Sequence, residues 1–148
     1  MTLDAKMADQ SSIGDRPGDL ECFLQSLSHH PEFVEEFRLA RCECGSVEFR
    51  FHSNYHEEVC RRTCVQCRAR HWLCDSEQHS KRARRQKWVC PSCGESVVNV
   101  GVRFLLYRSR VGVWFIVVGV RCVACGLMDW PLSWKVAAGP AERYLDTV

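Results

Sequence analysis

The chain has 148 residues, and its 20 basic and 18 acidic side chains leave a net charge of +2. This length fits one ordinary domain, or two small domains that share a surface. The longest apolar run, residues 111–120, has ten residues including two glycines, whereas a membrane-spanning helix needs roughly 20 apolar residues. We therefore expect no membrane segment and interpret residues 111–120 as a buried strand.

The charge is unevenly distributed along the chain. Residues 1–40 carry three basic and eight acidic side chains, residues 41–89 carry eleven and six, and residues 90–148 carry six and four. The net charges of these segments are therefore −5, +5 and +2. An acidic arm beside a basic middle is compatible with a nucleic-acid surface, or with contact between two parts of the same chain.

Cysteine spacing indicates metal binding rather than disulfide bonds. Eight of the eleven cysteines form close pairs and the total is odd, which is atypical of a disulfide framework. The first residues include Asp4, Lys6 and Asp9, where a secretory leader would be apolar. Since disulfide scaffolds belong to oxidising compartments, we expect a reducing compartment, the cytoplasm.

The N-terminal part is expected to be a tail followed by helix. Residues 1–18 are polar and aperiodic, and we interpret them as a disordered tail. Asp19 is a candidate N-cap for a short amphipathic helix, and residues 31–37 are expected to add further helical turns. Cys22 is expected to be a small core residue of this helix. The helical segment, residues 19–40, is too short to be stable unless it docks on another element or another protein.

A first cysteine group follows. A Cys-x-Cys-Gly turn at residues 42–45 faces a Cys-x-x-Cys turn at residues 64–67, and alternating side chains predict strands around them. Cys60, His71 and Cys74 are alternative ligands if the tighter turn does not close. The expected metal ligands are Cys42, Cys44, Cys64 and Cys67. The expected strands are residues 47–51, 56–63 and 69–74.

A basic hinge, residues 77–88, separates this group from the next. Five of the seven side chains at residues 81–87 are positively charged. Their helix propensity is good, so we expect one exposed helical turn or more.

The strongest motif is a pair of Cys-x-x-Cys-Gly turns, at residues 90–94 and 122–126. Two such turns can present four thiolates in a tetrahedron, the ligand set of a structural Zn²⁺ with no open position. Glycine after the second cysteine suits the positive φ that a tight turn often needs. The expected ligands are Cys90, Cys93, Cys122 and Cys125, and the expected strands are residues 96–107, 111–121 and 128–136.

Both faces of the strand at residues 111–121 are apolar. Such a strand must be covered on both sides, which a solitary three-stranded sheet cannot do. The cover is expected to come from the first cysteine unit, from the N-terminal helices, or from a second chain. Gly139-Pro140 is expected to open a short C-terminal helix.

The cysteine turns and their glycines resemble the zinc-ribbon superfamily over residues 42–136. The resemblance implies structural zinc and, often, contact with nucleic acid or a polymerase. The transcript-cleavage ribbons of that superfamily carry an acidic pair at the hairpin tip. This chain has Arg108-Ser109-Arg110 at the matching place, so that activity is not implied.

The fold class that we predict is a small, mainly-β, metal-stabilised protein built from two tandem zinc ribbons. Each ribbon is expected to be a three-stranded antiparallel sheet, with a short N-terminal helical segment and a short C-terminal helix beside them. Two structural zinc ions are the expected cofactors. The predicted organisation is a tail (1–18), a helical segment (19–40), a first ribbon (41–76), the hinge (77–88) and a second ribbon with the C-terminal helix (89–148).

Two functional hypotheses follow, and neither is catalytic, because the P-C-x-x-C half of the zinc-deaminase signature, a phosphate loop and a nucleophile elbow do not occur. The first is an adaptor, or an accessory or neutralising factor, that binds another protein through apolar and Trp-rich surfaces. Homo-oligomerisation is compatible with this hypothesis. An uncharacterised zinc-dependent enzyme is the least favoured interpretation.

The alternative hypothesis is nucleic-acid binding, to DNA or RNA. Arginines interleaved with Trp72 and Trp88 suit single strands, through phosphate attraction and base stacking. The candidate residues are Arg61, Arg62, Arg68, Arg70, Lys81, Arg82, Arg84, Arg85 and Lys87.

Overall fold

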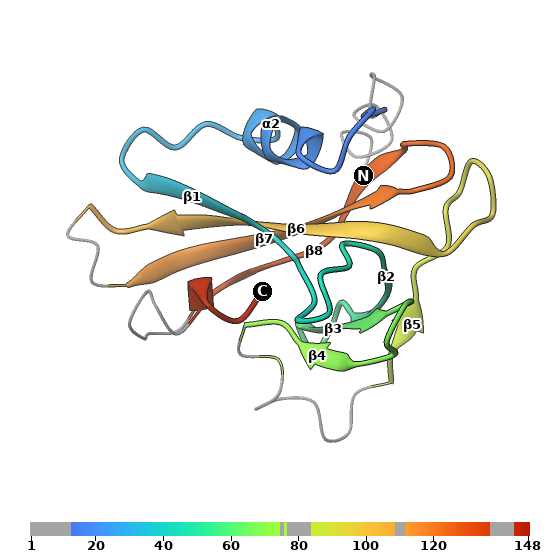
Figure 1. Ribbon diagram of the computed structural model, residues 1–148. Coiled ribbons are helices and arrows are strands. Elements are labelled where there is room, and N and C mark those ends of the chain that lie inside the picture. Colours follow the sequence, from blue (N-terminus) through green and yellow to red (C-terminus); the bar gives the residue numbers. More distant parts are fainter. Residues whose placement is uncertain (1–12, 75, 77–83, 109–111, 137–143) are drawn as a thin grey trace.

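Figure 1 shows the computed structural model, which describes residues 13–74, 76, 84–108, 112–136 and 144–148. Within this part of the chain, eight strands form one antiparallel sheet in the order β4-β3-β2-β6-β7-β8, while β1 pairs with β6 and β5 pairs with β2. The prediction of a mainly-β antiparallel protein is confirmed. No helix among the described residues has the length and apolar character needed to cross a membrane.

Three long strands carry the second cysteine group. They lie close to their predicted ranges: β6 (Val97–Leu106), β7 (Val113–Cys122) and β8 (Met128–Lys135). The register pairs Val98 with Cys122, so the turn before β6 and the turn after β7 lie at the same end of the sheet. Pro131 stands in β8, an edge strand, where a missing N–H is tolerated.

The first cysteine group is carried by shorter strands. These are β2 (Phe49–Asn54), β3 (Val59–Cys64) and β4 (Arg70–Trp72). The sequence predicts two separate three-stranded sheets, but β2 also pairs with β6, through Phe49 with Val98 and Arg50 with Val97. The two units therefore form one sheet, because β6 is long enough to offer its edge to β2 at one end and to another strand at the other.

That other strand is β1 (Val34–Leu39), and it corrects the helical interpretation of residues 31–37. Only α2 (Asp19–Ser26) of the expected helical segment is an α-helix. β1 pairs with residues 101–106 of β6, and the Ala40 N–H donates to the Val100 carbonyl at 2.8 Å. The apolar spacing that suggested a helix also fits a strand. The strand forms because the backbone of β6 would otherwise lack hydrogen-bond partners along this edge.

Part of the predicted disordered tail is ordered. Residues 1–12 lie outside the described part, but Ile13 forms an isolated bridge with Leu127. The Gly14 N–H donates to the Gly126 carbonyl at 2.8 Å, and the Gly14 carbonyl accepts from Arg121 Nε at 2.7 Å. The expectation of disorder is therefore wrong for residues 13–18, because this backbone hydrogen-bonds to the second cysteine turn.

Strand β7 is covered on both faces by the same chain, which is the cover that its apolar pattern predicts. On one face, α2 buries Leu20 and Leu24 completely, and a Cβ on Gly119 would lie 2.7 Å from Leu24. On the other face, Ile116 and Val118 join a core that includes Phe49 and other first-unit residues. In Figure 1, α2 lies on the opposite side of the long strands from β2–β4.

Two further expectations fall partly outside the described residues. The basic run begins in residues 77–83, which are not described, while Gln86–Lys87 form β5 rather than a helical turn. The expected C-terminal helix falls mainly on residues 137–143, also not described. Tyr144 beyond them is 4 % exposed and belongs to the main core.

Candidate functional site

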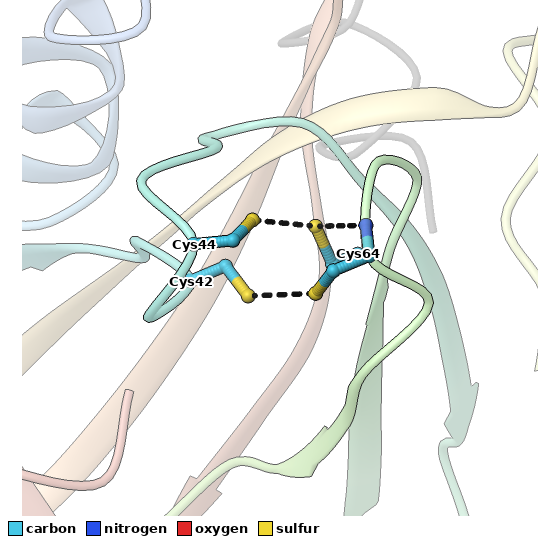
Figure 2. A group of neighbouring side chains, drawn as sticks. Cys42, Cys44 and Cys64 are labelled. Atoms are coloured by element: carbon cyan, nitrogen blue, oxygen red, sulfur yellow. Dashed lines mark hydrogen bonds between the residues drawn. The ribbon is translucent and has the colours of Figure 1, made fainter.

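Two groups of four cysteine sulfurs each lie close enough to hold one ion. Within each group the Sγ atoms all lie within 4.8 Å of one another. Figure 2 shows the sulfurs of Cys42, Cys44 and Cys64 in the first group pointing toward a common centre. The members are the eight cysteines that the sequence predicts: Cys42, Cys44, Cys64 and Cys67, and Cys90, Cys93, Cys122 and Cys125.

The sulfur positions fit a tetrahedral metal ion. In the first group, Cys42 Sγ lies 3.4 Å from Cys67 Sγ, and Cys44 Sγ lies 3.6 Å from Cys64 Sγ. In the second group, the pairs Cys90–Cys125 and Cys93–Cys122 are each separated by 3.5 Å. Four sulfurs at about 2.3 Å from one Zn²⁺ would be about 3.8 Å apart. Both clusters therefore fit such an ion. In each cluster the first cysteine of the earlier turn lies beside the last cysteine of the later turn, and the two remaining cysteines lie beside each other.

The local backbone explains why these turns present their sulfurs. The Cys64, Cys90 and Cys122 N–H groups each donate to the carbonyl five residues ahead, at 2.8–2.9 Å. Each turn ends in a residue with positive φ, and these are Gly45 (95°), Arg68 (66°), Gly94 (80°) and Gly126 (85°). Arg68 is the exception, since a left-handed backbone costs a non-glycine residue about 1–2 kcal/mol.

Crowding of the thiols separates their pKa values in the first cluster. The Cys67 N–H is the main cause of the Cys64 pKa falling to about 6. The Ala69 N–H lowers the pKa of Cys67, but the neighbouring thiols and burial outweigh it and raise that pKa to about 12. One sulfur therefore ionises readily, and its negative charge opposes ionisation of the others. A bound divalent cation would remove this electrostatic cost of ionising the remaining thiols.

The second cluster has the same pattern. Burial raises the pKa of Cys90, yet the amides of Cys93 and Ser92 outweigh burial and lower it. The Glu95 N–H lowers the pKa of Cys93, but burial and the nearby thiols raise it to about 12. The donor set, four sulfurs without a nitrogen or oxygen ligand, is typical of a closed structural site.

The alternative ligands of the first cluster lie elsewhere. The buried Cys60 accepts a 3.9 Å hydrogen bond from Ser76 Oγ. His71 Nε2 lies 3.0 Å from the Thr147 carbonyl oxygen, and Cys74 Sγ lies 3.9 Å from the Tyr144 carbonyl oxygen. His71 and Cys74 thus contact the C-terminal residues. Cys22 is exposed on α2, so the expectation that it is a core residue is wrong.

A second feature is the outer face of the first unit. The register places Trp72 opposite Arg61, Arg61 opposite His52, and His52 opposite Lys87. These four side chains form one row across β4, β3, β2 and β5. Side chains two positions away along a strand share a face. We call the resulting surface the basic face; its residues are Arg50, His52, Arg61, Arg70, Trp72, Arg85 and Lys87.

The cations of the basic face have no carboxylate partner among the described residues. The Arg61 and Arg85 guanidinium carbons lie 5.3 Å and 5.0 Å from the Trp72 ring centroid. In the part of the chain that the structure describes, no carboxylate lies within 4.0 Å of the charged nitrogens of Arg61, Arg70, Arg85 or Lys87. Burial, and then the charges of Arg61, Lys87, Arg85 and Arg70, lower the pKa of His52. The face is therefore a site of uncompensated positive charge.

The predicted nucleic-acid residues separate into four groups. Arg61, Arg70, Arg85 and Lys87 belong to the basic face, and Arg84 is exposed beside it. Arg62 points to the interior, where it is 6 % exposed, lies over the Phe49 ring and donates to the Val148 carbonyl at 3.0 Å. Arg68 is exposed on the cysteine turn. Lys81 and Arg82 lie outside the described residues.

Sequence reasoning missed Arg50 and His52. The available signal was the alternation Phe49-Arg50-Phe51-His52, in which both phenylalanines are buried and Arg50 is exposed. The same alternation in β3 separates Arg61 from Arg62. Trp88, a predicted stacking residue, instead donates from Nε1 to Asp129 at 3.1 Å and is half-buried.

Comparisons with protein-family models, with curated proteins and with solved structures found no significant match to this chain. The part of the zinc-ribbon resemblance that the structure supports is two four-cysteine groups on antiparallel hairpins, suited to metal binding. Function is therefore inferred from the two clusters and the basic face.

Proposed function

We propose that the protein is a non-catalytic, two-zinc β-sheet protein that binds nucleic acid through the basic face. The observation that supports this most directly is the row Trp72, Arg61, His52 and Lys87, whose cations have no carboxylate partner among the described residues. A polyanion would neutralise this charge. Trp72, over whose ring the Arg61 and Arg85 guanidinium groups lie, adds an aromatic side chain to this surface, and base–aromatic contacts are general to nucleic-acid binding.

The proposed role of the metal ions is to hold this surface in place. The first cluster ties residues 42–45, ahead of β2, to the turn between β3 and β4, and thereby supports the strands of the basic face. Four thiolates leave no open coordination position for a substrate. Zinc is the proposed metal, since tetrahedral sulfur sites select zinc or iron. Elemental analysis is expected to give two zinc ions per chain, and fewer than about one would contradict the proposal.

The local nature of the charge makes salt dependence informative. The net charge of the chain is only +2, so attraction to a polyanion must come from the basic face rather than from the whole molecule. Each neutralised phosphate contributes about 0.7–0.9 to the slope of log K against log salt. Loss of two contacting cations is thus expected to reduce that slope by about 1.5.

The test compares two double variants with equal charge change. Arg70→Ser with Lys87→Ser removes exposed cations of the basic face, while Arg16→Ser with Lys135→Ser removes exposed cations elsewhere. Fluorescence anisotropy of a labelled oligonucleotide, titrated with zinc-loaded protein at several salt concentrations, gives the affinity and the slope. The first variant is expected to lose affinity and slope, and the second is expected to keep both. Equal losses, or no binding by the unaltered protein at low salt, would overturn the proposal.

A protein partner stays a prediction. This prediction rested on the apolar strand at residues 111–121 and on the N-terminal helix. Both pack largely within this chain's own core. Among the described residues the exposed large apolar side chains are Ile13, Tyr55, Val89 and Tyr107, which come from four separate segments.

A further inference from the structure

We propose that Tyr55 and the groove beside it receive an unpaired nucleobase, so that the protein prefers single-stranded nucleic acid to a duplex. This inference rests on the proposed nucleic-acid binding and adds the strand type and the residue that selects it. It is carried by a groove and an exposed aromatic ring that lie outside the row of Trp72, and by cations that the groove wall shares with the basic face.

The groove lies beside the turn that follows β2. It has a volume of about 970 Å³, and its lining includes Tyr55, His56, Arg84, Arg85, Lys87 and Trp88. A second hollow of about 360 Å³ adjoins it, and the two share Tyr55 and Pro131. Tyr55 therefore stands between two hollows. Grooves of several hundred Å³ are large enough for small organic ligands, and a nucleotide is one of these.

Tyr55 is unusual in its exposure. Its side chain is 69 % exposed, the highest value among the large apolar side chains that the structure describes. Its ring contact within this part of the chain is an edge-on contact with His56 at 5.9 Å. An exposed aromatic ring beside cations is a stacking platform for a base, and such stacking does not depend on base identity.

The turn that carries Tyr55 is fixed to the basic segment. Asn54 Nδ2 donates to the Arg84 carbonyl at 2.6 Å, and Asn54 Oδ1 accepts from the Glu57 N–H at 3.0 Å. Ser53 pairs with Gln86. Phosphates held by Arg85 and Lys87 would therefore be at a defined position relative to the Tyr55 ring.

Strand selectivity follows from the geometry of stacking. In a duplex the base faces are covered by their neighbours, so a base reaches a protein ring only after it is unstacked. Arg85 and Lys87 belong both to the groove and to the basic face, and phosphates of either nucleic acid can contact them. Tyr55 adds an interaction that only an unpaired strand can make. The cations that line the groove would also attract other polyanions, so an acidic peptide is the competing occupant.

The experiment uses the zinc-loaded full chain and the matched variants Tyr55→Ala and Tyr55→Phe, with circular dichroism and zinc content to verify folding. Anisotropy is measured with labelled oligothymidine and with a duplex of the same length. Tyr55→Ala is expected to weaken oligothymidine binding by about 5- to 150-fold, the range for one lost stacked base, without changing duplex binding. Tyr55→Phe, which keeps the ring, is expected to bind as the unaltered protein does.

The outcomes separate the two proposals. If the unaltered protein binds oligothymidine but Tyr55→Ala binds it equally well, the inference is overturned while nucleic-acid binding stands. If the unaltered protein binds neither probe, the proposed function fails, and this inference fails with it. If polyglutamate binds as tightly as oligothymidine at the same salt concentration, the groove is a site for acidic peptides and the inference is wrong.

Discussion

The two cysteine units of this protein have the same ligand arrangement but differ in what surrounds it. In the second unit, β6 and β7 are buried along nearly their whole length, and the backbone of Gly14 covers the Gly126 turn. In the first unit, one face of β2–β4 packs on the core while the other carries the basic face. One metal-binding motif thus supports a core in one place and an exposed surface in the other.

Arginine shows the same contrast. Arg103, on β6, is 1 % exposed; it donates to Glu35, to the Leu24 carbonyl and to both Ser28 oxygens. Arg70, on β4, is exposed, and in the described part of the chain no carboxylate pairs with it. The charge of Arg103 is thus neutralised inside the fold, whereas the charge of Arg70 stays exposed, as the proposed binding surface requires.

The largest expected effect tests whether the two clusters contribute differently to the stability of the fold. Cys64→Ser and Cys122→Ser remove equivalent, buried ligands, 1 % and 0 % exposed. Structural zinc can contribute on the order of 10 kcal/mol, comparable to the whole stability of a domain. Cys122→Ser is expected to abolish cooperative folding. Cys64→Ser is expected to lose one zinc ion and unfold β2–β4 alone, as measured by zinc content and hydrogen exchange.

The contrary outcome is that each of the two variants loses protection from hydrogen exchange equally in the first and the second cysteine unit. This would show that the sheet unfolds as one unit. A graded chelator provides a second measurement on the unaltered chain. The ion of the first cluster is expected to leave first, because its strands are shorter and Cys44 and Cys67 are exposed. The Cys64→Ser variant serves as the single-site control.

A smaller effect is expected from the arginines. Arg103→Ala leaves the Glu35 carboxylate without its partner, and breaking such a pair typically costs about 3–5 kcal/mol. Arg70→Ala is the matched control, and its free energy of unfolding is expected to change by no more than about 0.5 kcal/mol. Urea denaturation of the zinc-loaded proteins measures both. Similar values for the two variants would contradict the distinction between a structural and a surface arginine.

The smallest effect concerns the turns. Arg68→Gly relieves the positive φ of 66° at that residue, and is expected to raise the free energy of unfolding by about 0.5–1 kcal/mol. The reciprocal Gly94→Arg places a side chain at a φ of 80° and is expected to lower it by a similar amount. Thermal unfolding of zinc-loaded protein gives both signs, and a destabilised Arg68→Gly variant would show that the Arg68 side chain matters more than its backbone.

Sequence patterns were sufficient for features that depend on neighbouring residues. The spacing of the cysteine turns placed the eight clustered cysteines, and alternation located all three strands of each unit within a few residues. The helical interpretation of residues 31–37 rested on Phe33, Val34 and Phe37. It failed because Phe33 and Phe37, four residues apart, share a face in a helix and in a strand alike. What decided their conformation was the unpaired edge of β6, far away in the sequence.

By itself, the sequence determined which cysteines gather and where the three strands of each cysteine unit lie, because turn chemistry and side-chain alternation act over a few residues. Only the tertiary structure decided that the two units share one sheet and that α2 covers β7. It also decided that Arg61 faces outward while Arg62 and Arg103 face inward. These outcomes depend on which backbone edges and apolar faces meet, and such contacts are made between residues far apart along the chain.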